Sequence, residues 1–312
     1  MLSLKRIPHS DKVLFPKSGI TKGGLIAYYE AIATYILPYL KNRPLTLHRF
    51  PDGIDKKGFF QKNASIYFPD WIQKEKIKKQ GGWVNHVICN QKDTLIYLAG
   101  QGTITLHITL STLDKLDYPD KLIFDLDPPN GSFDTVIDGA QALRSLLETE
   151  LGLTSYPMLT GSSGIHLVIP LDRSENFDGV RSFAKKVVHY LAKIRPKDFT
   201  VDMRKDERKG RLFLDYLRNS YAQTAVCPFS VRALENAPVA APISWEELGK
   251  GIKSAQKYTI RTILDRLAHT PNAWKDFDEK HYCLDNAKKK LEHLSMTTVD
   301  TDIAFKATFK NI

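Results

Sequence analysis

Cysteine is scarce in this sequence of 312 residues. Its three cysteines, Cys89, Cys227 and Cys283, include no CxxC pair. An odd number without metal-ligand spacing argues against both a disulfide framework and a zinc ribbon. This pattern suits a reducing compartment, so we expect a cytoplasmic protein.

Long apolar runs are also missing. The first 19 residues, MLSLKRIPHSDKVLFPKSG, hold no apolar stretch long enough for a signal peptide, and no later segment has transmembrane character. Internal repeats and low-complexity tracts are absent from the sequence. Hydrophobic residues nevertheless make up 42% of the chain, which is ample for a buried core and excludes a natively disordered protein.

The charge balance is basic. The chain carries 45 Lys and Arg against 35 Asp and Glu, a net charge of +10 and a pI of about 9.3. Such a balance favours polyanionic partners such as nucleic acid. A generally basic enzyme would show the same balance, so the candidate site must decide between them.

Hydrophobic periodicity predicts helices and strands in mixed order. We expect helices over 22–40 (with Thr21 as N-cap), 133–151, 177–194 and from 244. Strands are predicted over 44–50, 84–90, 94–99, 102–110, 121–127, 153–159, 165–171 and around Asp215, with PPNG stopping the strand that ends at 127. Several strands follow one another through hairpin-length links. The pattern therefore predicts an α/β fold with mixed or antiparallel sheets and flanking helices, rather than a doubly wound parallel sheet.

Carboxylates on apolar strands are the sharpest chemical feature. Asp125 and Asp127 in KLIFDLD are two residues apart, so they project from one face of a strand. Their repulsion calls for a divalent cation, and oxygen ligands suit Mg²⁺ or Mn²⁺. Asp215 is a third acid on an apolar strand, and three acids could hold two metals. One metal would activate a primer 3′-hydroxyl and the other would neutralise leaving pyrophosphate.

Two other interpretations of the acidic pair remain open. A solvated pair at a strand end would look the same. Haloacid-dehalogenase phosphatases also carry an acidic pair after an apolar strand and use the first aspartate as nucleophile. In those enzymes Gly and Thr follow, whereas Pro128 and Pro129 follow here.

A Gly/Ser turn precedes His166 in TGSSGIH. Its N–H groups could cradle an anion, and the Thr160 and Ser162 hydroxyls could contact a sugar or phosphate. A hairpin with a half-buried histidine is the simpler alternative. His107, in TLHITL, allows the same two interpretations.

A basic run and an aromatic pair add candidates for nucleic-acid contact. The run DMRKDERKGR covers 202–211 and directly precedes Asp215, so it could bring positive charge over the metal site. Most such runs are solvated loops. Phe59 and Phe60 could stack on bases, or one could enter the core while the other stays on the surface.

Six motifs in one order carry a family resemblance. They are DKVLFP, RFPDG followed by GFFQKN, LIFDLDPP, TGSSGIH, FLDYLRN, and PFSVRA leading to APVAAPISWEEL. Together they resemble the polymerase domain of bacterial DNA ligase D, in the archaeo-eukaryotic primase superfamily, from about residue 5 to about residue 295.

The resemblance implies a single primase-like catalytic domain of two packed subregions over 1–295, followed by a polar tail over 296–312. It implies metal-dependent, DNA-directed nucleotidyl transfer with Mn²⁺ or Mg²⁺, extending or filling ends and gaps that carry a 5′-phosphate during non-homologous end joining. NTPs or dNTPs would be substrates, with ribonucleotides preferred. Ku and a DNA ligase would be partners, and the protein would work at the bacterial nucleoid without a membrane partner.

The resemblance also implies roles for single residues. Asp125, Asp127 and Asp215 match the catalytic metal acids. The remaining matches are nucleotide-site histidines (His107, His166), a residue near the sugar 2′-hydroxyl (Thr160), a triphosphate arginine (Arg232), aromatics at the incoming base and the template (Phe60, Phe59), lysines at a downstream 5′-phosphate (Lys12, Lys22) and an arginine on the loop before the third acid (Arg208).

Three places depart from the family pattern. Ser163 stands where a lysine is common, so a phosphate contact is lost or is supplied by Arg49 or Arg232. His48 also stands where a lysine often precedes RFP, and HITLST, which begins at His107, differs from the commoner HPW form. Other functions also stay open: a de novo primase, a metal phosphohydrolase with Asp125 as nucleophile, and a non-catalytic module that binds DNA ends.

Overall fold

The computed structural model describes residues 8–79, 81–128, 132–270 and 273–308. Most of the predicted PPNG stop signal lies outside these residues. Within the described part of the chain, no helix combines the length and apolar character needed to cross a membrane.

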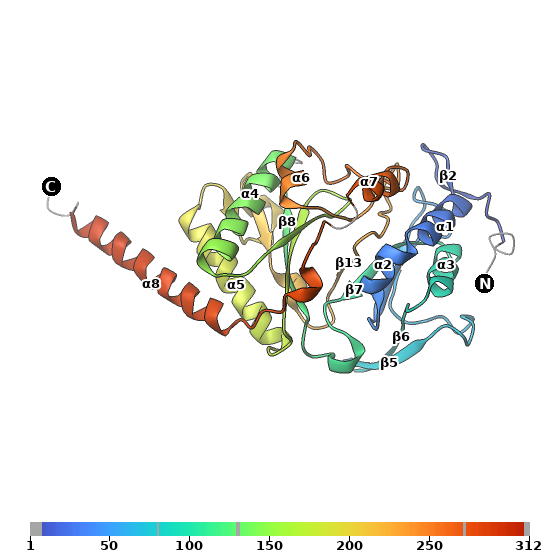
Figure 1. Cartoon of the computed structure of the whole chain (residues 1–312), viewed down its shortest axis with the longest axis horizontal. Helices are drawn as coiled ribbons and strands as arrows, with labels where there is room; N and C mark the ends of the chain where they lie inside the picture. The colour runs from blue at the N-terminus through green and yellow to red at the C-terminus, as the bar shows by residue number, and fades with distance from the viewer. Residues whose placement is uncertain (1–7, 80, 129–131, 271–272, 309–312) are drawn as a thin grey trace.

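The larger sheet has six strands in the order β11-β12-β8-β10-β9-β14. Only β11 and β12 pair in parallel, and the other neighbours are antiparallel. Figure 1 shows α4 and α5 beside β8. The elements are β8 (Lys121–Asp127), β9 (Tyr156–Leu159), β10 (Ile165–Pro170), β11 (Phe199–Thr200), β12 (Leu212–Asp215), β14 (Ala241–Pro242), α4 (Phe133–Ser145) and α5 (Phe177–Ile194).

The smaller sheet has four strands in the order β13-β7-β3-β4. On β7, Ile104, Leu106 and Ile108 are buried and alternate with threonines and His107, so one face of the strand enters the core and the other is polar. The elements of this half are β3 (Leu45–Arg49), β4 (Phe59–Gln61), β7 (Thr103–Thr109), β13 (Thr224–Val226), α1 (Lys22–Ala31), α2 (Ala33–Leu40) and α3 (Lys92–Gly100).

Two ribbons and the C-terminal helices complete the chain. They are β1 (Val13–Phe15) with β2 (Ile20–Thr21), β5 (Lys74–Lys79) with β6 (Gly82–Val87), α6 (Trp245–Gly249), α7 (Ile263–His269) and α8 (Asp285–Thr308). Short helical turns are η2 (Leu113–Lys115), η3 (Leu146–Glu150), η4 (Lys205–Arg208), η5 (Leu217–Asn219) and η6 (Phe277–Glu279). In Figure 1, α8 extends away from the body. It crosses residue 296, so the division into a domain and a tail there stays a prediction.

The α/β class with mixed and antiparallel sheets is confirmed. Three element predictions need correction. The helix expected over 22–40 is interrupted at Ile32, which ends α1 and precedes α2. The helix expected over 133–151 is α4 followed by the wider π-turn η3. The strand expected over 94–99 is wrong, because this short apolar run lies in helix α3 and buries Leu95, Ile96 and Leu98. Short apolar runs fit either element by pattern alone.

One cluster of buried apolar side chains joins both halves. It includes Leu47 and Leu106 from the smaller sheet, and Phe124, Leu126 and Leu167 from the larger one. This shared core holds the polar face of β7 in fixed relation to the end of β8.

Candidate active site

Four polar side chains are aligned by the register of the larger sheet. On β8, Asp125 pairs with His166 of β10 on one side and with Asp215 of β12 on the other. Directly opposed residues project from the same face, so this row lies side by side. Asp127 shares the face because it is two residues along β8. The four residues come from three segments far apart in sequence, and the strand order brings these segments together.

Asp125 is the buried centre of the row, with its side chain only 6% exposed. Its Oδ2 accepts a hydrogen bond from Arg218 Nε at 3.1 Å, and its Oδ1 lies 3.4 Å from His166 Nε2. Burial by itself would raise the pKa of Asp125, but His166 and Arg218 together lower it below the ordinary value. Asp125 is therefore held ionised.

For the other two acids, the same positive groups do not outweigh burial and the charge of Asp125. Burial, and then the negative charge of Asp125, raise the pKa of Asp127. Burial also raises the pKa of Asp215, to which Asp125 again contributes. Asp215 Oδ1 accepts a hydrogen bond of 2.7 Å from the backbone N–H of Leu217. The three carboxylates on this face therefore differ, with the pKa of Asp125 lowered and those of Asp127 and Asp215 raised.

Two glycines, which have no side chain, allow the TGSSG turn to lie close against this face. Gly164 lies so near β8 that a Cβ there would be 2.1 Å from the Leu126 carbonyl oxygen. Gly161 has a φ of +67°, and its Cβ would meet the backbone of Val239 at 2.8 Å. Larger residues at either position would push the turn away from the acids. The Ser163 hydroxyl consequently lies 3.4 Å from Asp127 Oδ1.

Thr160 closes the turn. Its hydroxyl donates to the Gly164 carbonyl at 3.0 Å and accepts long contacts of 3.3 Å from the N–H groups of Ser162 and Gly164. Arg232 Nη1 donates to the Thr160 carbonyl at 3.1 Å, which ties the turn to the guanidinium. The Thr160 side chain is buried but lines the pocket beside Asp125 and Asp127.

A pocket of about 210 Å³ joins the acids to the smaller sheet. Its walls include His107, Asp125, Asp127, Thr160, Ser162, His166, Arg218 and Arg232. Burial, followed by Arg232, lowers the pKa of His107 to about 3, so this imidazole is neutral at physiological pH. Both predicted histidines therefore reach the pocket, from different sheets.

Phe60 and His48 form an aromatic shelf beside His107. The Phe60 ring stacks on His48, with centroids 4.0 Å apart and planes inclined by 10°, and its centroid lies 5.7 Å from that of His107. Phe59 and Phe60 are 45% and 62% exposed. The alternative with one phenylalanine in the core is therefore wrong, and both rings are available to bases.

Arg49 does not join the pocket. It is buried, and its guanidinium donates to the Gln101 carbonyl, Gln61 Oε1 and the Tyr67 hydroxyl. Of the two arginines predicted to replace a phosphate contact of the missing lysines, Arg232 lines the pocket and Arg49 does not. The Arg49 guanidinium instead lies 5.5 Å from the centroid of the Phe59 ring.

Lys12 and Lys22 are neighbours at the far end of the smaller half. The backbone N–H of Lys22 donates to the Lys12 carbonyl at 2.8 Å. Lys12 Nζ pairs with Asp52 at 2.6 Å, and Lys22 Nζ donates to the Pro8 carbonyl. Burial, followed by Lys12, lowers the pKa of Lys22. The structure thus places the two lysines side by side through their backbones, with each ammonium group bound to a different partner.

The first amides of α1 are not free to bind a phosphate. The N–H groups of Lys22, Gly23 and Gly24 already donate to the Lys12 carbonyl, the Ser10 carbonyl and Thr21 Oγ1. Anion binding here would therefore rely on the two ammonium groups, which would have to leave Asp52 and the Pro8 carbonyl.

Arg208 folds back on its own loop. Its guanidinium donates to the carbonyls of Asp202 and Met203 and lies 4.0 Å from the Phe213 ring. This conformation places the predicted loop arginine outside the residues that line the pocket.

Arg218 and Asn219 belong to this site by their contacts, but were not predicted as site residues from the sequence. Asn219 is fully buried, and its amide exchanges hydrogen bonds with the N–H and carbonyl of Ile123 on β8. It acts like a short strand residue and holds η5, with Arg218, beside the acids. The FLDYLRN motif contained both residues, but no local rule indicates where their side chains go.

The donor set fits a hard divalent cation. Asp125, Asp127 and Asp215 supply carboxylate oxygens, the ligands that Mg²⁺ and Mn²⁺ prefer. Burial and the charge of Asp125 raise the pKa values of Asp127 and Asp215, and a cation beside these carboxylates would favour their ionised forms. Among the described residues, however, no three His, Cys, Asp or Glu side chains already form a cage for a metal ion.

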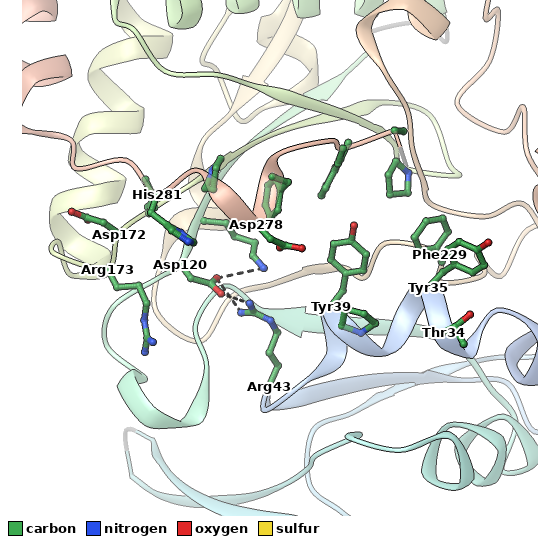
Figure 2. Close-up of a pocket in the computed structure, with 18 of the residues that line it drawn as sticks. Thr34, Tyr35, Tyr39, Arg43, Asp120, Asp172, Arg173, Phe229, Asp278 and His281 are labelled. Atoms are coloured by element: carbon green, nitrogen blue, oxygen red, sulfur yellow. Dashed lines mark hydrogen bonds and ion pairs between the residues drawn. The ribbon is translucent and has the colours of Figure 1, made fainter. Parts of the chain in front are cut away.

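A second cavity lies at the opposite end of the same strands (Figure 2). It has a volume of about 680 Å³, and Lys121 and Pro170, paired at the far end of β8 and β10, both line it. Arg43 and Lys121 form ion pairs with Asp120, and Tyr39 contributes an aromatic wall (Figure 2). Four residues along a strand place it about 13 Å from Asp125, outside the acidic site.

This fold and site define a class. Acids on neighbouring antiparallel strands, a neutral histidine, an arginine-tied Gly/Ser turn and nearby exposed aromatic rings fit a nucleotidyl transferase of the primase-polymerase type.

Comparison with known proteins agrees. Residues 21–274 match the family described as "LigD, primase-polymerase domain". The bifunctional non-homologous end joining protein LigD of Bacillus subtilis is 36% identical over 259 residues, covering 82% of this chain and 41% of that protein. The multifunctional LigD of Mycolicibacterium smegmatis is 32% identical over 265 residues, covering 84% and 34%. The polymerase domain of Mycobacterium tuberculosis ligase D, solved in complex with DNA, superposes with a TM-score of 0.82 at 28% identity, covering 90% of this chain and 99% of that one.

The chain therefore belongs to the LigD primase-polymerase domain family. It is a nucleotidyltransferase, and this family is metal-dependent in general. The phosphohydrolase interpretation is accordingly set aside. The chain spans about two fifths of the length of the Bacillus relative and about one third of the Mycolicibacterium one.

Proposed function

We propose that this chain extends or fills DNA ends and gaps during bacterial non-homologous end joining, by primer- and template-directed nucleotidyl transfer with Mn²⁺ or Mg²⁺. The observation that carries the proposal is the row of His166, Asp125 and Asp215 across three strands, with Asp127 on the same face. The names of the relatives and the DNA complex of the mycobacterial domain support the context.

The reaction joins the primer 3′-oxygen to the α-phosphorus of a nucleotide and releases pyrophosphate. Asp125, Asp127 and Asp215 would hold the divalent cation, which when bound acidifies the primer hydroxyl and neutralises phosphate charge. Arg232 lines the same pocket as Asp125 and Asp127 and would bind the triphosphate. Phe60, on its exposed shelf, would stack on the incoming base, and Phe59 would meet the template.

Sugar choice is proposed to depend on Thr160. Its hydroxyl already donates to Gly164, and the two N–H contacts that it accepts are long. A ribose 2′-hydroxyl can therefore donate to the same oxygen, which a deoxyribose cannot. This supports a preference for ribonucleotides.

Recognition of the DNA end is proposed to depend on the ammonium groups of Lys12 and Lys22. A terminal 5′-phosphate carries more charge than an internal phosphodiester, so a compact lysine pair distinguishes an end from continuous duplex. Arg208 would contact DNA from the loop before β12 if it left Phe213. Ku and a ligase are proposed partners, at the bacterial nucleoid, and residues 1–295 are proposed to act as one catalytic domain.

A gapped duplex with a 5′-phosphate tests the function. Wild type should extend the primer by an acid-stable phosphodiester with ATP or dATP in Mn²⁺ or Mg²⁺, and Asp125→Asn should not. A matched template without primer separates extension from de novo priming. Release of free phosphate without extension would contradict the proposal.

A further inference from the structure

We infer that Arg218 is a built-in counterion that must leave Asp125 before a metal ion can bind there, and that the nucleotide triphosphate draws it away. Metal binding and nucleotide binding would then be coupled through one side chain. The inference rests on the proposed function, because it assumes that the acids hold a cation and that the pocket holds a nucleotide.

The contacts of Asp125 carry the first step. One of its oxygens accepts from Arg218 Nε and the other faces His166 Nε2, at 3.1 and 3.4 Å. The carboxylate is nearly enclosed, and each of its oxygens faces a protein group. A cation that binds Asp125 Oδ2 would meet the guanidinium of Arg218 beside the same oxygen, and the two positive charges would repel.

Exposure decides which group leaves. The His166 side chain is 5% exposed and is fixed within β10 between two neighbouring strands. The Arg218 side chain is 40% exposed and projects from the short turn η5. Asn219 anchors the backbone of that turn to Ile123, so the guanidinium can swing while its Cα stays in place.

The pocket offers the displaced guanidinium a new partner. Arg218 lines the same cavity as Thr160, Ser162 and Arg232, which is where the triphosphate would lie. Guanidinium groups bind phosphate oxygens through parallel hydrogen bonds. Arg218 would thus stabilise the acids in the empty enzyme and the phosphates in the loaded one. It acts as a positioning residue, since it controls whether Asp125 is available.

Mn²⁺ titration followed by electron paramagnetic resonance tests the inference without catalysis. Without nucleotide, Arg218→Gln should bind Mn²⁺ about tenfold more tightly than wild type, because no charge-assisted hydrogen bond has to be broken. A non-reactive ATP analogue with a methylene α,β-bridge should tighten Mn²⁺ binding in wild type. That gain should shrink in Arg218→Gln, because binding couplings are reciprocal.

Arg232→Gln is the matched control. It removes the same charge from the same pocket, but Arg232 hydrogen-bonds a carbonyl and not an acid. Its effect on Mn²⁺ affinity without nucleotide should be clearly smaller. Arg218→Lys, which keeps the charge but loses the Nε contact, should lie between wild type and Arg218→Gln.

Weaker or unchanged Mn²⁺ binding by a folded Arg218→Gln protein would overturn the inference. Equal tightening by Arg232→Gln would also overturn it, because net charge would then explain the effect. Circular dichroism and urea unfolding establish that each variant is folded. Primer extension is measured separately, so tighter Mn²⁺ binding without any wild-type extension would support the counterion and contradict the proposed function.

Discussion

Replacing Asp127 with Asn should inactivate the enzyme and stabilise the metal-free protein. Asp125 and Asp127 are two residues apart on one strand face, a separation of about 7 Å. Two unit charges at that distance repel by about 2 kcal/mol at an effective dielectric constant of about 20. Attraction of Asp127 to His166 and Arg218 offsets part of this repulsion. The expected gain in free energy of unfolding is therefore about 1 kcal/mol at neutral pH.

The gain should depend on pH in a defined direction. The folded-state pKa of Asp127 is raised above its ordinary value of 3.8. The contribution of Asp127 to wild-type stability therefore falls as pH rises from 3.8 through the raised pKa, because the folded protein must release a proton that the unfolded chain has already lost. Below pH 3.8 both states are protonated, so the difference between wild type and Asp127→Asn should vanish there.

Urea unfolding in EDTA at several pH values measures the stability, and extension of a gapped duplex measures activity. Extension should fall by about 10²–10³-fold or more, as when other electrostatic groups at catalytic centres are removed. Asp138→Asn, an exposed change on α4, is the control and should alter neither quantity. A less stable Asp127→Asn protein at neutral pH, or one with full activity, would refute the reasoning.

Three further outcomes are expected. Thr160→Val should reduce the preference for ribonucleotides over deoxyribonucleotides, a discrimination of about 1–3 kcal/mol; competition assays measure it, and a wild type that prefers deoxyribonucleotides contradicts the role of Thr160. Wild type should bind gapped DNA with a 5′-phosphate more tightly than the same DNA with a 5′-hydroxyl, at one fixed salt concentration. The double change Lys12→Ala, Lys22→Ala should erase this difference, while simple primer extension survives at high enzyme concentration. Equal wild-type affinity for the two ends would remove the end-recognition proposal. Asn219→Ala should lower the free energy of unfolding by about 3 kcal/mol, since it leaves the buried N–H and carbonyl of Ile123 unpaired; urea unfolding checks this, and a loss below about 1 kcal/mol would show that water or a backbone shift replaces the amide.

Local patterns were sufficient wherever the evidence for an element lies within the element. The helix over 177–194 has the predicted bounds, and Thr21 caps α1 through Gly24. Alternation along 121–127 was enough to put Asp125 and Asp127 on one face. The order of the motifs was enough to indicate the family, because each motif is short and local.

Long-range pairing decided the rest. The sequence contained Asp215 and His166, but only the order of β12, β8 and β10 sets them on either side of Asp125. In the sequence, Arg49 and Arg218 are both arginines, and their local patterns do not indicate their partners. Tertiary contacts bind the first to Gln101 and Gln61 and direct the second at Asp125. Residue type and periodicity carry strand and helix preferences, whereas the partner of a buried charge depends on which distant strand lies beside it.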